Sequence, residues 1–83
     1  MAKHSIKIFG KGCGSCIWTE RLVRDVVAQS GVEVDIVKVT KTSEMVPYGV
    51  VSTPAIVIDE RVVHVGGIPT KAEVQRWVRE LQA

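Results

Sequence analysis

Two cysteines, Cys13 and Cys16, are the only ones in this chain of 83 residues, and two residues separate them. They follow a short apolar segment and precede a segment of helical period, so we expect them at the start of a helix. The unpaired N–H groups and the partial positive charge of a helix N-terminus stabilise a thiolate. In C-x-x-C motifs the pKa of the first thiol commonly falls below its usual value of about 8.5. The spacing also lets the second sulfur reach the first, so the pair is suited to redox chemistry.

Length and composition limit the possible functions. A chain of this length predicts a single domain, residues 1–83. The net charge of +2, with both signs mixed throughout, gives no reason to expect nucleic acid or an anionic membrane as a partner. No apolar stretch is long enough to span a bilayer, and the first residues lack the apolar core of a signal peptide. We therefore expect a cytoplasmic protein, in which a lone cysteine pair is more often catalytic or metal-binding than structural.

Hydrophobic periodicity predicts an α/β protein. Gly10 and Gly12, on either side of Lys11, are expected to let the chain turn sharply into the first long helix. Thr70 and Glu73 form the sequence of a capping box before the last helix. The first helix is expected to bury an apolar stripe of Ile17, Trp18, Leu22, Val23, Val26 and Val27. The predicted strands are 5–9, 32–39, 55–58 and 62–65, and the predicted long helices are 14–29 and 71–82.

Two connections are less regular. Thr42 and Ser43 are candidate N-caps for a short helix over residues 44–48. Asp59 and Glu60 join two strands in an antiparallel hairpin. That connection lacks the glycine that the tightest hairpins prefer, so we expect a slightly looser turn.

The order β-α-β-(short α)-β-β-α, with C-x-x-C at the first strand–helix junction, resembles the thioredoxin fold with a four-stranded mixed sheet. Ser52-Thr53-Pro54-Ala55 strengthens the resemblance, because proteins of this fold carry a cis proline just before the third strand, facing the disulfide. The whole chain resembles the small glutaredoxin-like redox-active disulfide proteins of bacteria and archaea. The matching segments are Gly12-Cys13-Gly14-Ser15-Cys16, Tyr48-Gly49-Val50, Ser52-Thr53-Pro54-Ala55, and Gly66-Gly67 with Pro69.

This resemblance implies a thiol–disulfide oxidoreductase. Cys13 would be the nucleophile and Cys16 the resolving thiol. A disulfide-containing protein substrate would contact Thr53, Pro54, Gly66 and Gly67. No metal or prosthetic group is implied, the protein is expected to be a monomer, and a flavoprotein resembling thioredoxin reductase would restore the dithiol.

The chain also departs from the larger families. Ile6 and Ile8 supply no counterpart of the buried acid that larger thioredoxins carry on the strand before the motif. Glutaredoxins have an acidic pair soon after the two glycines to hold glutathione, but here residues 68–70 read Ile-Pro-Thr. The resemblance therefore does not extend to glutathione use.

Several alternatives stay open at this stage. The motif also resembles the loop of copper-chaperone domains, in which two thiolates hold Cu(I), although those domains are β-α-β-β-α-β. Zinc would need four ligands, and only His4 and His64 could join the cysteines. Trp18 is equally compatible with covering the disulfide or lying in the core. Tyr48 is expected to pack under the Thr-Pro loop.

Overall fold

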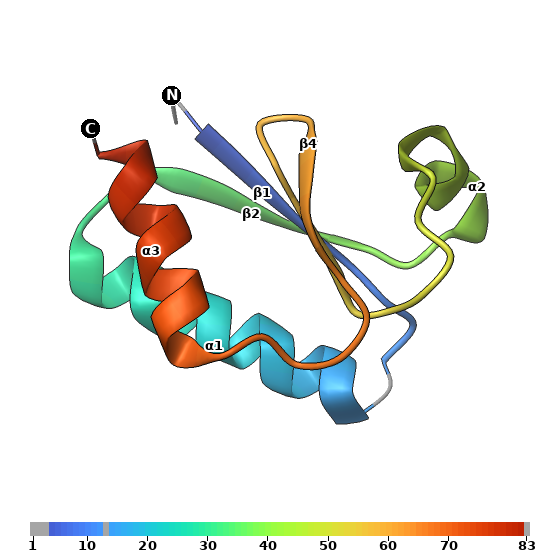
Figure 1. Cartoon of the computed structure of the whole chain (residues 1–83), viewed down its shortest axis with the longest axis horizontal. Helices are drawn as coiled ribbons and strands as arrows, with labels where there is room; N and C mark the ends of the chain where they lie inside the picture. Colours follow the sequence, from blue (N-terminus) through green and yellow to red (C-terminus); the bar gives the residue numbers. More distant parts are fainter. Residues whose placement is uncertain (1–3, 13, 83) are drawn as a thin grey trace.

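The computed structural model describes residues 4–12 and 14–82 (Figure 1). Its strands form one mixed sheet in the order β2-β1-β3-β4. β1 pairs parallel with β2, with Ile6 opposite Ile36, and antiparallel with β3, with Ile8 opposite Ile56. The elements follow the predicted order and differ from the predicted bounds by at most two residues, except in the short helical segment. They are β1 (His4–Phe9), α1 (Gly14–Ser30), β2 (Val34–Val39), α2 (Thr42–Met45), the 3-10 turn η1 (Val46–Tyr48), β3 (Ala55–Ile58), β4 (Arg61–Val65) and α3 (Lys71–Leu81).

The long helices α1 and α3 lie together on one face of the sheet (Figure 1). β1 contributes Ile6 and Ile8 to the core beneath them, and α3 contributes Trp77. Burying such side chains stabilises the fold by about 1.5–3 kcal/mol each. The other buried members of this core are Val23, Val26, Val27, Ile56, Ile58, Val74 and Val78.

The predicted apolar stripe of α1 was wrong at its start. Ile17 and Trp18 are exposed, whereas Cys16 and Thr19 are buried. The buried positions of the helix are 16, 19, 23, 26 and 27, which keep the spacing of three and four residues that defines one helix face. The stripe therefore begins at Cys16 itself, and Trp18 lies on the opposite side of the helix.

The other face of the sheet is covered near one end of its strands by α2 and η1, which lie apart from α1 and α3 (Figure 1). Met45 and Tyr48 pack there against Phe9 and Val57. The short helix begins at Thr42, so Thr42 and Ser43 lie within it and are not its N-caps. Its N-cap is Lys41, which makes no side-chain capping bond.

The β3–β4 hairpin is tighter than its sequence predicts. Only Asp59 and Glu60 connect the strands, and both have positive φ, 48° and 69°. This is the geometry that two-residue hairpin turns favour, and it costs about 1–2 kcal/mol for a residue other than glycine. The Asp59 carboxylate accepts a 2.9 Å hydrogen bond from the Ser5 N–H and lies 2.8 Å from His4 Nδ1. These contacts help to offset the cost.

The last helix follows the prediction closely. Thr70 Oγ1 accepts a hydrogen bond from the Glu73 N–H, and the Glu73 carboxylate accepts one from the Thr70 N–H. Both bonds satisfy donors that a helix start leaves unpaired. Among residues 4–12 and 14–82, no helix has the length and apolar character needed to cross a bilayer.

Candidate functional site

Cys16 lies in the first turn of α1 and is 2% exposed. Gly10, the residue after β1, lies directly against it, and a Cβ built on Gly10 would overlap the Cys16 sulfur and come within 2.8 Å of the Cys16 Cβ. Gly10 also continues the strand ladder, because its N–H donates to the Val39 carbonyl at 3.0 Å. Gly10 is therefore needed for this close approach and not for the sharp turn that the sequence suggested. Cys13, the predicted nucleophile, lies outside the described residues.

The Thr53–Pro54 segment meets Cys16 at the same place. A Cβ on Gly10 would lie 4.0 Å from the Thr53 Cβ, so Thr53 and Cys16 both border Gly10. The peptide bond between Thr53 and Pro54 is cis, as the resemblance implied. Pro54 is buried, whereas Thr53 is exposed and makes no backbone hydrogen bond within the described residues.

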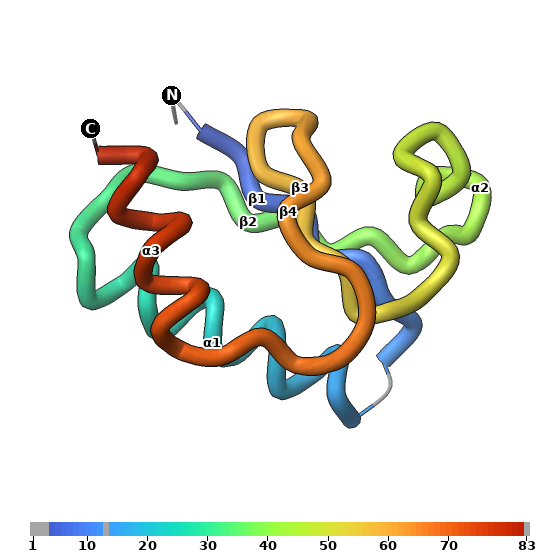
Figure 2. Tube along the Cα trace, viewed as in Figure 1, coloured from blue at the N-terminus to red at the C-terminus, as the bar shows by residue number. Residues whose placement is uncertain are grey.

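Gly66 lies beside the same segment, and Gly67 follows it in the chain with a φ of 71°. The Gly66 N–H donates to the Pro54 carbonyl at 2.8 Å, and a Cβ on Gly66 would lie 3.6 Å from the Ser52 Cβ. Gly66 has a φ of 77°, which favours glycine. Figure 2 shows the segment leading into β3 and the segment leaving β4 meeting near the end of β1. The structure thus brings together Cys16, Thr53, Pro54 and Gly66 from three separate parts of the chain.

One buried polar residue of this region was missed by sequence reasoning. Thr19 has no exposed surface, and its Oγ1 donates a 2.7 Å hydrogen bond to the Ser15 carbonyl one turn earlier. This local bond satisfies the hydroxyl, so the side chain can be buried next to the cysteine turn. Its position three residues after Cys16 and four before Val23 was the available signal.

A second polar cluster lies on the sheet face that carries Phe9. Lys7 Nζ donates to Tyr48 Oη at 2.8 Å and to Glu60 at 2.9 Å, and Tyr48 Oη donates to Glu60 at 2.6 Å. The hydrogen bonds from Tyr48 and Lys7 hold the pKa of Glu60 below its ordinary value. Those to Tyr48 and Glu60 raise the pKa of Lys7. Tyr48 also packs edge-on against Phe9 with ring centroids 5.3 Å apart, so it contacts the end of β1.

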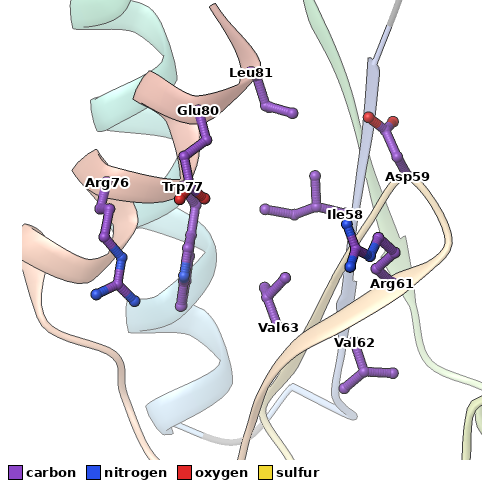
Figure 3. A pocket seen from close by; sticks show the side chains of 9 residues that line it. All are labelled: Ile58, Asp59, Arg61, Val62, Val63, Arg76, Trp77, Glu80 and Leu81. Atoms are coloured by element: carbon purple, nitrogen blue, oxygen red, sulfur yellow. The ribbon is translucent and has the colours of Figure 1, made fainter. Parts of the chain in front are cut away.

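A groove of about 740 Å³ lies elsewhere, between β4 and α3 (Figure 3). Arg61, Val63 and Trp77 line it, and none of its lining residues belongs to the cysteine region. Trp77 is a core residue. His64 lies next to it at a centroid distance of 5.9 Å, and its Nε2 lies 2.9 Å from the Gly67 carbonyl oxygen. The groove therefore contributes nothing to the redox site.

The described part of the chain contains no group of three or more histidine, cysteine or acidic side chains placed to hold a metal. His4 contacts the Asp59 carboxylate, whereas His64 belongs to β4, 60 residues later in the chain. The architecture also ends on a helix, with the strand order given above, and so differs from the β-α-β-β-α-β arrangement that the copper-chaperone alternative requires.

The strand order, the paired helices on one face and the cis proline before β3 define the thioredoxin fold. A mutant thioredoxin from Halobacterium salinarum NRC-1 superposes with a TM-score of 0.76 at 20% identity, over 95% of this chain and 74% of that one. Chloroplastic thioredoxin z gives a TM-score of 0.75 at 19% identity, over 95% and 78%. At these identities the likeness concerns the fold alone.

The sequence comparisons go further. The thioredoxin domain family matches residues 4–79. The thioredoxin of Methanocaldococcus jannaschii is 37% identical over 74 residues, which are 89% of this chain and 85% of that protein. The chain belongs to the thioredoxin domain family, and it is a thiol–disulfide oxidoreductase. The resemblance drawn from the cysteine and Thr-Pro motifs is thereby confirmed at the level of the thioredoxin-fold redox proteins.

Proposed function

We propose that the protein reduces disulfide bonds of other proteins with the dithiol of Cys13 and Cys16. The Cys13 thiolate attacks a substrate disulfide, one substrate sulfur leaves as a thiol, and a mixed disulfide forms. Cys16 then attacks the Cys13 sulfur, releases the second substrate thiol and leaves a Cys13–Cys16 disulfide. Two electrons pass from the dithiol to the substrate. The protein needs no metal or prosthetic group for this reaction.

The convergence of Cys16 and Thr53 on Gly10 carries the proposal. A buried Cys16 in the first turn of a helix suits a thiol that attacks only its neighbour, since it is shielded from outside disulfides. The exposed Thr53 backbone, free of backbone hydrogen bonds within the described residues, can pair with an extended substrate segment. Pro54, Gly66 and Gly67 shape the wall on that side.

Serine variants of the two cysteines test the role assignment. Cys13→Ser removes the nucleophile and should abolish reduction of insulin, a convenient protein disulfide. Cys16→Ser removes only the resolving thiol and should accumulate a mixed disulfide that mass spectrometry detects. If Cys16 is alkylated faster than Cys13 at neutral pH, the two roles are assigned the wrong way round.

The reductant is proposed to be a flavoprotein of the thioredoxin-reductase class, acting on a cytoplasmic monomer. Ile68, Pro69 and Thr70 follow the two glycines where an acidic pair would hold glutathione. Turnover with thioredoxin reductase should therefore exceed turnover with glutathione. A faster glutathione-dependent rate would instead place the protein with the glutaredoxins.

A further inference from the structure

The outward face of the first turns of α1 carries two large apolar side chains beside the redox motif. Ile17 and Trp18 are 49% and 60% exposed. Side chains on a helix lean toward its N-terminus, so these two lean toward the turn that contains Gly14 and Ser15. A Cβ on Gly14 would meet nothing within 4 Å, so the space over that turn is open. This exposed apolar surface therefore begins one residue after Cys16, in the first turns of the helix that carries the redox motif.

Arg21 adds a positive charge to this face. Its guanidinium lies 5.5 Å from the centroid of the Trp18 ring, the distance of a cation–π contact. Arg24 and Lys38 both pair with Glu20. Within residues 4–12 and 14–82, no carboxylate lies within ion-pair distance of Arg21. The Trp18 ring therefore holds an arginine that is available to a carboxylate from another molecule.

We propose that Ile17, Trp18 and Arg21 form a docking surface for the disulfide-bearing protein partner. It favours partners that carry an apolar side chain and a carboxylate close to the reactive cysteine. This inference rests on the proposed function, because the partner must reach the C-x-x-C motif. Ile17 and Trp18 would contact the partner's apolar side chain, and the Arg21 guanidinium would pair with its carboxylate. Because the guanidinium is already held against the Trp18 ring, Arg21 loses less conformational entropy when this pair forms.

A second copy of the chain fits this surface poorly. In a symmetric dimer the same patch contacts itself, so the two Arg21 side chains would be brought toward each other. A partner with complementary charge has no such repulsion.

Peptides with one activated cysteine isolate the docking step. Three nine-residue peptides each carry a central cysteine joined by a disulfide to 2-nitro-5-thiobenzoate. They differ only in the pair of residues on each side of that cysteine, which is leucine and glutamate in the first peptide, leucine and lysine in the second, and two serines in the third. The reduced protein attacks the peptide sulfur and releases the coloured aryl thiolate. Cys16 then attacks the Cys13 sulfur of the mixed disulfide and releases the peptide thiol. The dithiol loses two electrons and becomes the Cys13–Cys16 disulfide, and the peptide–aryl disulfide gains them and becomes two thiols. The second-order rate of colour release is measured for each peptide.

For the wild type, the leucine–glutamate peptide should react about tenfold faster than the serine peptide, as expected when a few side chains contribute about 1.4 kcal/mol. Trp18→Ala should remove most of this preference, and Arg21→Glu should shift it to the leucine–lysine peptide. All variants should react equally with the serine peptide. Val46→Ala, which removes an exposed apolar side chain outside α1, is the matched control and should keep the preference. The preference should also weaken as salt is added.

Three results would overturn the docking surface. One is an unchanged preference in both Trp18→Ala and Arg21→Glu. Another is an equal slowing of all peptides in Trp18→Ala, which would mean that the ring acts on the sulfur itself. The third is a dimer, detected by light scattering, that Trp18→Ala dissociates. Failure of the proposed function is distinguishable, because the wild type would then release colour from every peptide no faster than a simple dithiol does.

Discussion

Gly10→Ala tests whether the redox site depends on close approach of the backbone to Cys16. The added methyl group would overlap the Cys16 sulfur and lie 2.8 Å from the Cys16 Cβ. Gly10 is buried and held by its hydrogen bond to Val39, so it has little room to move. Overpacking a tight site costs about 1–3 kcal/mol. Replacing glycine recovers about 0.4–1 kcal/mol from the unfolded chain. We expect a net loss of about 1–2 kcal/mol in the free energy of unfolding.

Urea unfolding of the reduced protein measures this loss, and Gly14→Ala is the matched control. Gly14 lies in α1 and a Cβ there meets nothing within 4 Å, so alanine should leave stability unchanged or raise it by about 1 kcal/mol. Gly10→Ala should also slow the resolving step, because Cys16 must shift, and so increase the amount of mixed disulfide trapped with insulin. A Gly10→Ala protein as stable as the wild type would refute the close-approach argument.

Three further predictions concern the fold. Glu60 has a lowered pKa, so its contribution to stability is present above the ordinary glutamate pKa of 4.5 and is lost as the pH falls through the lower folded value. Glu60→Gln should therefore flatten the pH dependence of urea unfolding below pH 4.5, and an unchanged slope would contradict this. Thr70→Ala removes the N-cap oxygen and should cost about 0.5–2 kcal/mol, seen as a lower Tm, while Thr42→Ala, at a position without a capping bond, should cost less. Trp77→Ala should cost about 3–5 kcal/mol because the ring is in the core. Trp18→Ala should change stability by no more than about 0.5 kcal/mol, and equal losses in the two tryptophan variants would refute the assignment of core and surface.

Local signals made much of the fold predictable. The capping box at Thr70 and Glu73 acts within one turn, so its sequence is enough to locate the start of α3. The alternation in β1 and β3 likewise depends on a period of two that short apolar segments display directly. The Thr53–Pro54 segment was predictable only through the resemblance, because a cis bond leaves no mark in composition or periodicity.

Other features depend on contacts between distant segments and could not be predicted locally. Trp18 and Ile17 are apolar residues at helical spacing, yet the helix is turned so that Cys16 and Thr19 face the core. The hairpin at Asp59 and Glu60 lacks a glycine, and its tight form is stabilised by Ser5, 54 residues away from Asp59.

The geometry at Cys16 is likewise set from a distance. Phe9 precedes Gly10, and Tyr48 packs edge-on against Phe9 while its hydroxyl joins Lys7 to Glu60. Thr53 follows Tyr48 by only five residues in the chain. The aromatic pair thus connects the end of β1, which supplies the close approach to Cys16, with the segment that supplies the exposed backbone opposite it. Because Tyr48 packs against the end of β1 and precedes Thr53 by five residues, it links the two sides of the redox site while belonging to neither.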